Sequence, residues 1–186
     1  MASLESQYKA LKVNLQHQID AQLSKLLIEY AYALLYSAMH YKGYDDVTGN
    51  LREGITVGVY KNGSLYHQCQ DDGKSPTRLT LAKGERYDLP RYWDGRDNKG
   101  FYGEVGEGGQ SGPQEGKKFV KSYSINSQWG VVMVAPVEYA SHVEEAWGMN
   151  VLLESYLMAP GLLEHMLEGG NFVTQTNSLP EFELPF

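Results

Sequence analysis

The sequence predicts an α+β fold in which a long N-terminal helix and C-terminal helices pack on one face of a twisted antiparallel sheet of about four strands. Apolar residues recur at helical spacing over the first forty positions, and an alternating segment runs into Asn62-Gly63, a dipeptide typical of hairpin turns. The chain has 186 residues, of which 42% are hydrophobic, enough for one core but hardly for two. We therefore expect a single domain over residues 1–170, followed by an extended C-terminal arm over 171–186.

The N-terminal helix is predicted over residues 3–40. Apolar residues make eight steps from Leu4 to Leu34, a mean spacing of about 3.75, and no Gly or Pro occurs before Gly43. Such a helix is roughly 55 Å long, more than a small domain covers. Its first half carries only a thin apolar stripe, which we expect to pack on a neighbouring subunit. The stripe residues predicted for this interface are Leu4, Tyr8, Leu11, Leu15 and Ile19.

A β-hairpin is predicted next. Residues 55–60 alternate apolar and small side chains, as a half-buried strand does. Asn62-Gly63 suits a turn with positive φ angles, and residues 64–70 form the returning strand. Residues 71–116 then form a long insertion loop rich in Gly, with Pro76 and Pro90. Its aromatic residues are further candidates for partner contact, namely Tyr92, Trp93 and Tyr102.

The second half of the chain is predicted to hold another hairpin and the C-terminal helices. Residues 118–126 and 130–135 are interpreted as its two strands. Pro136 suits the first turn of a helix that Gly148 ends, and residues 149–158 carry further apolar, helix-like sequence. Pro160 then begins a last short helix that runs to Glu168. The C-terminal arm contains two prolines and is expected to lie on another surface through Phe182, Leu184 and Phe186.

Composition narrows the classes of function. The net charge is −7, and the longest basic run is Lys117-Lys118, so tight binding to a nucleic-acid backbone is not expected. Acidic walls would instead let DNA pass without adhering. The single Cys69 fits a reducing compartment. No secretory signal or membrane span is predicted, so we expect synthesis in the cytoplasm and no membrane partner.

Motifs that would indicate catalysis are incomplete. Residues 112–118, GPQEGKK, lack the first Gly and the final hydroxyl of a phosphate-binding loop, so a flexible loop is expected there. Residues 94–100, DGRDNKG, place Arg96 where a calcium ligand would stand. His142 has Glu145 close by, but two groups do not make a metal site. We predict no catalytic residue, no metal site and no cofactor.

One enzymatic alternative remains open at this point. Paired carboxylates beside aromatic platforms are what sugar-cleaving sites require. Residues 92–107 combine both kinds of side chain and would support a small glycoside hydrolase or a carbohydrate-binding module. The carboxylates concerned are Asp94, Asp97, Glu104 and Glu107.

Two stretches occur in a characteristic order, TGNLREGI at 48–55 and YASHVEEAWG at 139–148. With the long helix before them and the sheet between them, they resemble the neck or tail-completion proteins of long-tailed double-stranded DNA bacteriophages, which carry a TGxLRxSI-like element and a later YAxxVExG-like element. The residues that carry the resemblance are Thr48, Gly49, Leu51, Arg52, Ile55, Tyr139, Ala140, Val143, Glu144 and Gly148. We expect Leu51 and Ile55 in the core, Arg52 outside it, and Glu144 partly free.

The resemblance implies a non-enzymatic virion protein. Such a protein forms a homomeric ring in the neck, joins the capsid portal or head-completion protein to the tail tube or tail terminator, and leaves a channel through which DNA passes on ejection. Related rings, such as a tail terminator or a head-closure protein, are open alternatives within the same class.

Overall fold

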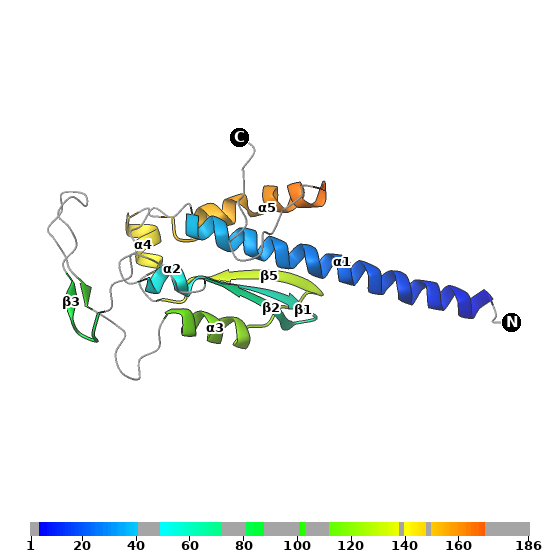
Figure 1. The fold of residues 1–186 in the computed structure, drawn as a ribbon, viewed down its shortest axis with the longest axis horizontal. Coiled ribbons are helices and arrows are strands. Elements are labelled where there is room, and N and C mark those ends of the chain that lie inside the picture. The colour runs from blue at the N-terminus through cyan, green and yellow to red at the C-terminus, as the bar shows by residue number, and fades with distance from the viewer. Residues whose placement is uncertain are drawn as a thin grey trace.

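The computed structural model describes residues 4–40, 49–71, 81–87, 101–102, 112–137, 140–147 and 150–169. In chain order the elements are α1 (Leu4–His40), α2 (Asn50–Gly54), β1 (Thr56–Lys61), β2 (Ser64–Gln70), β3 (Arg86–Tyr87), β4 (Phe101–Tyr102), α3 (Gly112–Ser122), β5 (Trp129–Val134), α4 (Ala140–Trp147) and α5 (Leu153–Leu167). Helices α1 and α5 lie on one side of the sheet, and α3 lies on the other (Figure 1). The predicted α+β class and the long N-terminal helix are confirmed.

Helix α1 has two halves with different surroundings. The second half lies between the sheet and α5, which explains why its sequence is apolar on nearly every side. The Tyr30 hydroxyl donates to the Ala159 carbonyl of α5 at 2.9 Å, and Leu162 and Met166 of α5 join the same core. The buried apolar residues of α1 are Leu27, Tyr30, Ala31, Ala33, Leu34, Leu35, Ala38 and Met39.

The main sheet has the strand order β2-β1-β5 and is antiparallel throughout. The predicted hairpin between β1 and β2 is confirmed, with φ of 51° at Asn62 and 84° at Gly63. Central strand β1 is buried on both faces because helices cover both: Val59 joins the core with α1, while the Tyr60 hydroxyl donates to Val120 of α3 at 2.7 Å. Strands β3 and β4 form a separate pair.

The prediction of a strand at 118–126, and of a flexible loop at 112–118, is wrong, because residues 112–122 form helix α3. This leaves three strands in the main sheet rather than about four. The buried face of α3 consists of Gly112, Gly116 and Val120, spaced four residues apart. The glycines let α3 approach its neighbours closely: a Cβ on Gly116 would overlap the hydroxyl of Thr56 in β1.

The C-terminal helices begin at other residues than predicted. Helix α4 begins at Ala140 rather than at Pro136, and α5 runs from Leu153 to Leu167 with Pro160 inside it. Proline commonly opens a helix because it lacks an amide hydrogen, but tertiary packing overrides that preference here. A cap from α4, described below, fixes the start of α5 about two turns earlier. None of the helices described is long and apolar enough to cross a membrane.

Candidate functional site

The two motif stretches, far apart in the sequence, meet in one apolar cluster. Leu51 from α2 packs with Ala140 and Val143 from α4, together with Val137 and Val151. All five side chains are buried. Ile55, the other apolar residue of the first motif, is fully buried in the main core as predicted. The motifs therefore join α2, α4 and the start of α5 into one unit, which we call the motif cluster.

The first motif also fixes the turn into the sheet. Gly49 has a φ of 76°, and a Cβ on it would meet the carboxylate of Glu53. The Asn50 side-chain oxygen accepts the Gly112 amide at 2.7 Å and so holds the start of α3. Arg52 does not stay outside as expected, since its side chain is half-buried and lies 3.6 Å from the Asp71 carboxylate. Asn50 and Arg52 of this motif thus both make local structural contacts.

Glu144, the acid of the second motif, is not free. Its carboxylate accepts the amides of Val151 and Leu152 at 2.7 Å each and that of Leu153 at 3.0 Å. These amides belong to the start of α5, where the residue at the cap position, Leu152, provides no side-chain cap of its own. Glu144 is therefore the N-terminal cap of α5, supplied from α4.

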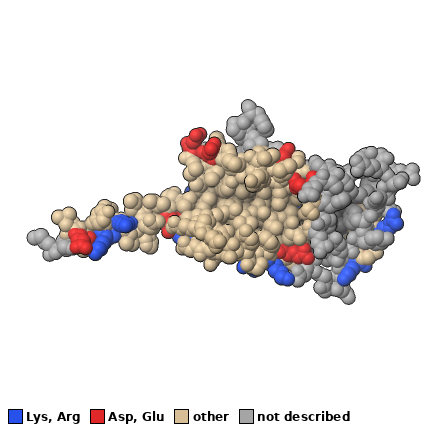
Figure 2. Space-filling model, turned by 180° about the vertical axis from the view of Figure 1, so that it is seen from behind, with Lys and Arg blue, Asp and Glu red and all other residues tan. Residues whose placement is uncertain are grey.

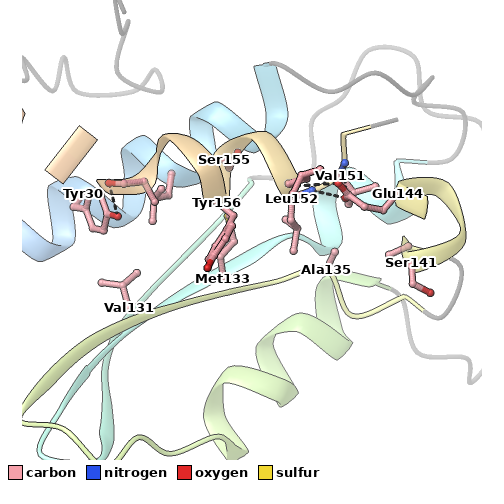
Figure 3. A pocket seen from close by; sticks show the side chains of 14 residues that line it. Tyr30, Val131, Met133, Ala135, Ser141, Glu144, Val151, Leu152, Ser155 and Tyr156 are labelled. Carbon is pink, nitrogen blue, oxygen red and sulfur yellow. Dashed lines mark hydrogen bonds between the residues drawn. The ribbon is translucent and has the colours of Figure 1, made fainter. Parts of the chain in front are cut away.

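A groove of about 650 Å³ opens next to the motif cluster, between β5 and α5. Val131 and Met133 of β5 line one side of it, and Leu152 and Tyr156 lie on the opposite side (Figure 3). Strand β5 forms an edge of the main sheet and pairs, among the described residues, with β1 alone. We call this cavity the β5–α5 groove; its lining is completed by Tyr30, Leu34, Ala135, Ala140, Ser141, Glu144, Val151, Leu153, Ser155 and Ala159.

The buried polar groups of the β5–α5 groove are already engaged by the protein. Tyr30 bonds to Ala159, Ser155 donates to Ser37 at 3.1 Å, and Glu144 caps α5. Burial raises the pKa of Tyr30 above its usual value, so its hydroxyl stays protonated. These groups are thus used within the fold, and the rest of the described lining is mostly apolar.

The thiol of Cys69, the single cysteine, is held in its protonated form by the fold. Cys69 on β2 is buried, and burial raises the pKa of its thiol to about 12. A thiol of this kind is almost entirely protonated at neutral pH, which removes its nucleophilic form. Within the described ranges, no three His, Cys, Asp or Glu side chains gather as metal ligands do.

The first sixteen residues of α1 form a second candidate surface. All of residues 4–19 are exposed, and they project from the body as a narrow rod (Figures 1 and 2). Asp20, the residue that follows this segment, contacts the body of the protein: its carboxylate accepts a hydrogen bond from Lys61 at 3.1 Å. The Lys61 ammonium nitrogen in turn lies 4.7 Å from the centre of the Trp129 ring. We call Leu4, Tyr8, Leu11, Leu15 and Ile19 the leading stripe; their side chains are between 50 and 87% exposed.

Several predicted site residues lie outside the part of the chain that the structure describes. This holds for the motif residues Thr48, Tyr139 and Gly148. It also holds for the side chains of the sugar-site alternative other than Tyr102, namely Tyr92, Trp93, Asp94, Asp97, Glu104 and Glu107. The backbone of Tyr102 pairs with Arg86 in the β3–β4 ladder. The C-terminal residues proposed for partner contact also fall outside, namely Phe182, Leu184 and Phe186.

The β5–α5 groove is the feature that sequence reasoning missed. The apolar run 130–135 was predicted as a strand paired with residues 118–126, whereas β5 pairs with β1, lies at an edge of the sheet and has only half-buried residues. A signal was present in α5, where Leu153, Tyr156 and Leu157 are apolar at helical spacing, in addition to the buried Leu162 and Met166. A helix that has a second apolar face, in addition to the face packed in the domain core, indicates a surface that the core does not cover.

Three comparisons with known proteins were made, and none found a match. No family model matches the chain, and no match comes from the curated proteins or from the solved structures. The likeness to phage neck proteins therefore rests on the two motif stretches and the order of the elements. The function has to be argued from the geometry of the described residues.

Proposed function

We propose that this chain is a structural virion protein that forms a homomeric ring in the neck of a long-tailed bacteriophage. The ring joins the portal or head-completion protein to the tail tube or tail terminator and leaves a channel for DNA. It catalyses no reaction. The observation that supports this most directly is the leading stripe, five large apolar side chains that are 50 to 87% exposed on a rod that projects from the body.

The size of the leading stripe supports assembly into more than a pair. Burying a Leu or Ile fully contributes about 1.5–3 kcal/mol. Five side chains that are at least half exposed therefore offer roughly 5–10 kcal/mol on association, similar to the roughly 4–15 kcal/mol that association costs in lost freedom. One such contact is marginal. A closed ring, in which each subunit makes two contacts, stabilises the assembly more than a pair does.

The motif cluster supports a function that depends on shape. Leu51, Ala140 and Val143 hold α2 and α4 together, and the carboxylate of Glu144 fixes the start of α5. Asn50 of the first motif likewise holds the start of α3 through its side-chain oxygen. A rigid wedge of this kind is suited to a ring subunit, and a net charge of −7 is suited to a wall past which DNA slides.

The test is assembly with the natural partners. Purified chain should sediment as an oligomer of defined size and should bind portal-bearing capsids or isolated tails, as seen by electron microscopy. A monomer without affinity for either partner would count against the proposal. Asp94→Asn with Glu104→Gln separates the sugar-site alternative, since loss of sugar cleavage or binding in that variant favours the enzyme and intact assembly favours the ring.

A further inference from the structure

We propose that the leading stripe of one copy occupies the β5–α5 groove of the next copy, so that the subunits join head to tail. This inference rests on the proposed homomeric assembly and names the two surfaces that make it. Both surfaces lie within the described residues.

The two surfaces are compatible in length. Residues 4–19 of α1 extend over roughly 24 Å at 1.5 Å per residue. The groove is lined on α5 from Leu153 to Ala159, roughly 10 Å of helix, and on the strand side from Val131 to Ala135, roughly 16 Å of chain. An incoming helix that lies along the groove would therefore be covered over about half of the stripe.

The two surfaces also match in chemistry. The stripe consists of three Leu, one Ile and one Tyr. The groove presents Val131 and Met133 from the strand and Leu153 and Tyr156 from the helix, and its buried polar groups are bonded within the protein. Contact with the stripe would leave these internal bonds intact, which avoids the cost of a buried polar group without a partner.

Charge favours the same pairing. Residues 4–19 contain Lys9 and Lys12 against the single Glu5, whereas residues 153–168 contain three Glu and neither Lys nor Arg. Opposite net charge at the edges of two apolar patches accelerates their encounter and disfavours pairing of like with like. Stripe-to-groove contact is therefore favoured over contact between two grooves.

The contact has to be made between copies. Tyr30 and Leu34, which line the groove, belong to the same continuous helix as the stripe. A straight helix cannot bring its own residues 4–19 back beside its residues 30 and 34. Two different patches that pair between copies make a heterologous contact, which generates rings when the rotation closes.

Complementation between variants tests the inference. A stripe variant carries Leu11→Glu with Leu15→Glu, and a groove variant carries Leu153→Glu with Tyr156→Glu; all four side chains are at least 50% exposed, so folding should survive. Each variant alone should sediment as a monomer, with self-association weakened at least about 100-fold. At concentrations high enough for a single contact to hold, their equimolar mixture should form a one-to-one dimer, because it retains one intact stripe and one intact groove.

Matched controls are Val13→Glu, 57% exposed on α1 but outside the stripe, and Leu167→Glu, 65% exposed at the end of α5 but outside the groove. Both should assemble as the unmodified chain does. The inference is overturned if the groove variant assembles normally, or if the mixture stays monomeric while circular dichroism shows both variants folded.

Disulfide trapping gives a second measurement that does not depend on the charged variants. Leu11→Cys with Tyr156→Cys in one chain should give a ladder of linked species on oxidation, and the buried Cys69 should not interfere. A dimer from Leu11→Cys alone would show that stripes pair with each other and would overturn the inference. If the unmodified chain does not bind capsids or tails, the proposed neck function fails. If the unmodified chain binds them and the groove variant binds equally well, only the stripe-to-groove inference fails.

Discussion

Replacing Glu144 by alanine removes the carboxylate that caps α5 from α4. In the native protein this group accepts the amides of Val151, Leu152 and Leu153. After the replacement the Leu153 amide can bond to water, because Leu153 is half exposed. The Val151 amide cannot easily do so, because Val151 is only 2% exposed.

The cost can be estimated from these partners. Loss of a helix N-cap typically costs about 0.5–2 kcal/mol, and a buried amide left without an acceptor costs about 1–3 kcal/mol. The two terms overlap, because the Val151 amide is part of the cap. We therefore expect the free energy of unfolding to fall by about 2–3 kcal/mol, and the melting temperature to fall by about 4–12 °C for a chain of this size.

The assay is denaturant unfolding followed by circular dichroism, together with a thermal melt. Glu144→Gln keeps one oxygen that can accept two of the amides but turns its NH₂ group toward the third, so about half of the loss is expected. Glu164→Ala, an exposed acid on α5, is the control and should change the free energy of unfolding by less than about 0.5 kcal/mol. The reasoning is refuted if Glu144→Ala changes it as little as the control does.

Three further expectations concern the core. Gly116→Ala should destabilise by about 1–3 kcal/mol or more in a urea melt, because the added methyl group overlaps the Thr56 hydroxyl; an unchanged midpoint would contradict the close packing. Tyr60→Phe should cost about 1–2 kcal/mol by removing the bond to Val120, measured in the same way. Cys69 should react with a thiol reagent only on unfolding; because burial raises its pKa to about 12, its contribution to stability should be complete below pH of about 8.5 and decline as the pH rises toward 12.

The parts of the fold that could be read from the sequence are those that local rules determine. The spacing from Leu4 to Leu34 identified α1, and Asn62-Gly63 identified the hairpin, because periodicity and turn geometry involve only neighbouring residues. Leu51 and Ile55 were correctly placed in the core for the same reason.

The parts that could not be read depend on tertiary contacts. Helix α3 was mistaken for a strand because its buried face is made of Gly112 and Gly116, which add nothing to a hydrophobic pattern. Helix α5 was split at Pro160 because its start is set by Glu144, a residue of another helix. The groove was missed because a sequence does not show which strand lies at an edge.

Helix α1 has a consequence for how subunits would communicate. The same unbroken rod carries the leading stripe at one end and, through Tyr30 and Leu34, forms a wall of the groove nearer its other end. If the proposed contact between copies forms, a tilt imposed on the tip of α1 would move the wall of the groove that receives the following subunit. In a ring of such subunits, binding of one copy would change the affinity of its groove for the next copy. Incomplete rings should therefore be scarce compared with free subunits and closed rings.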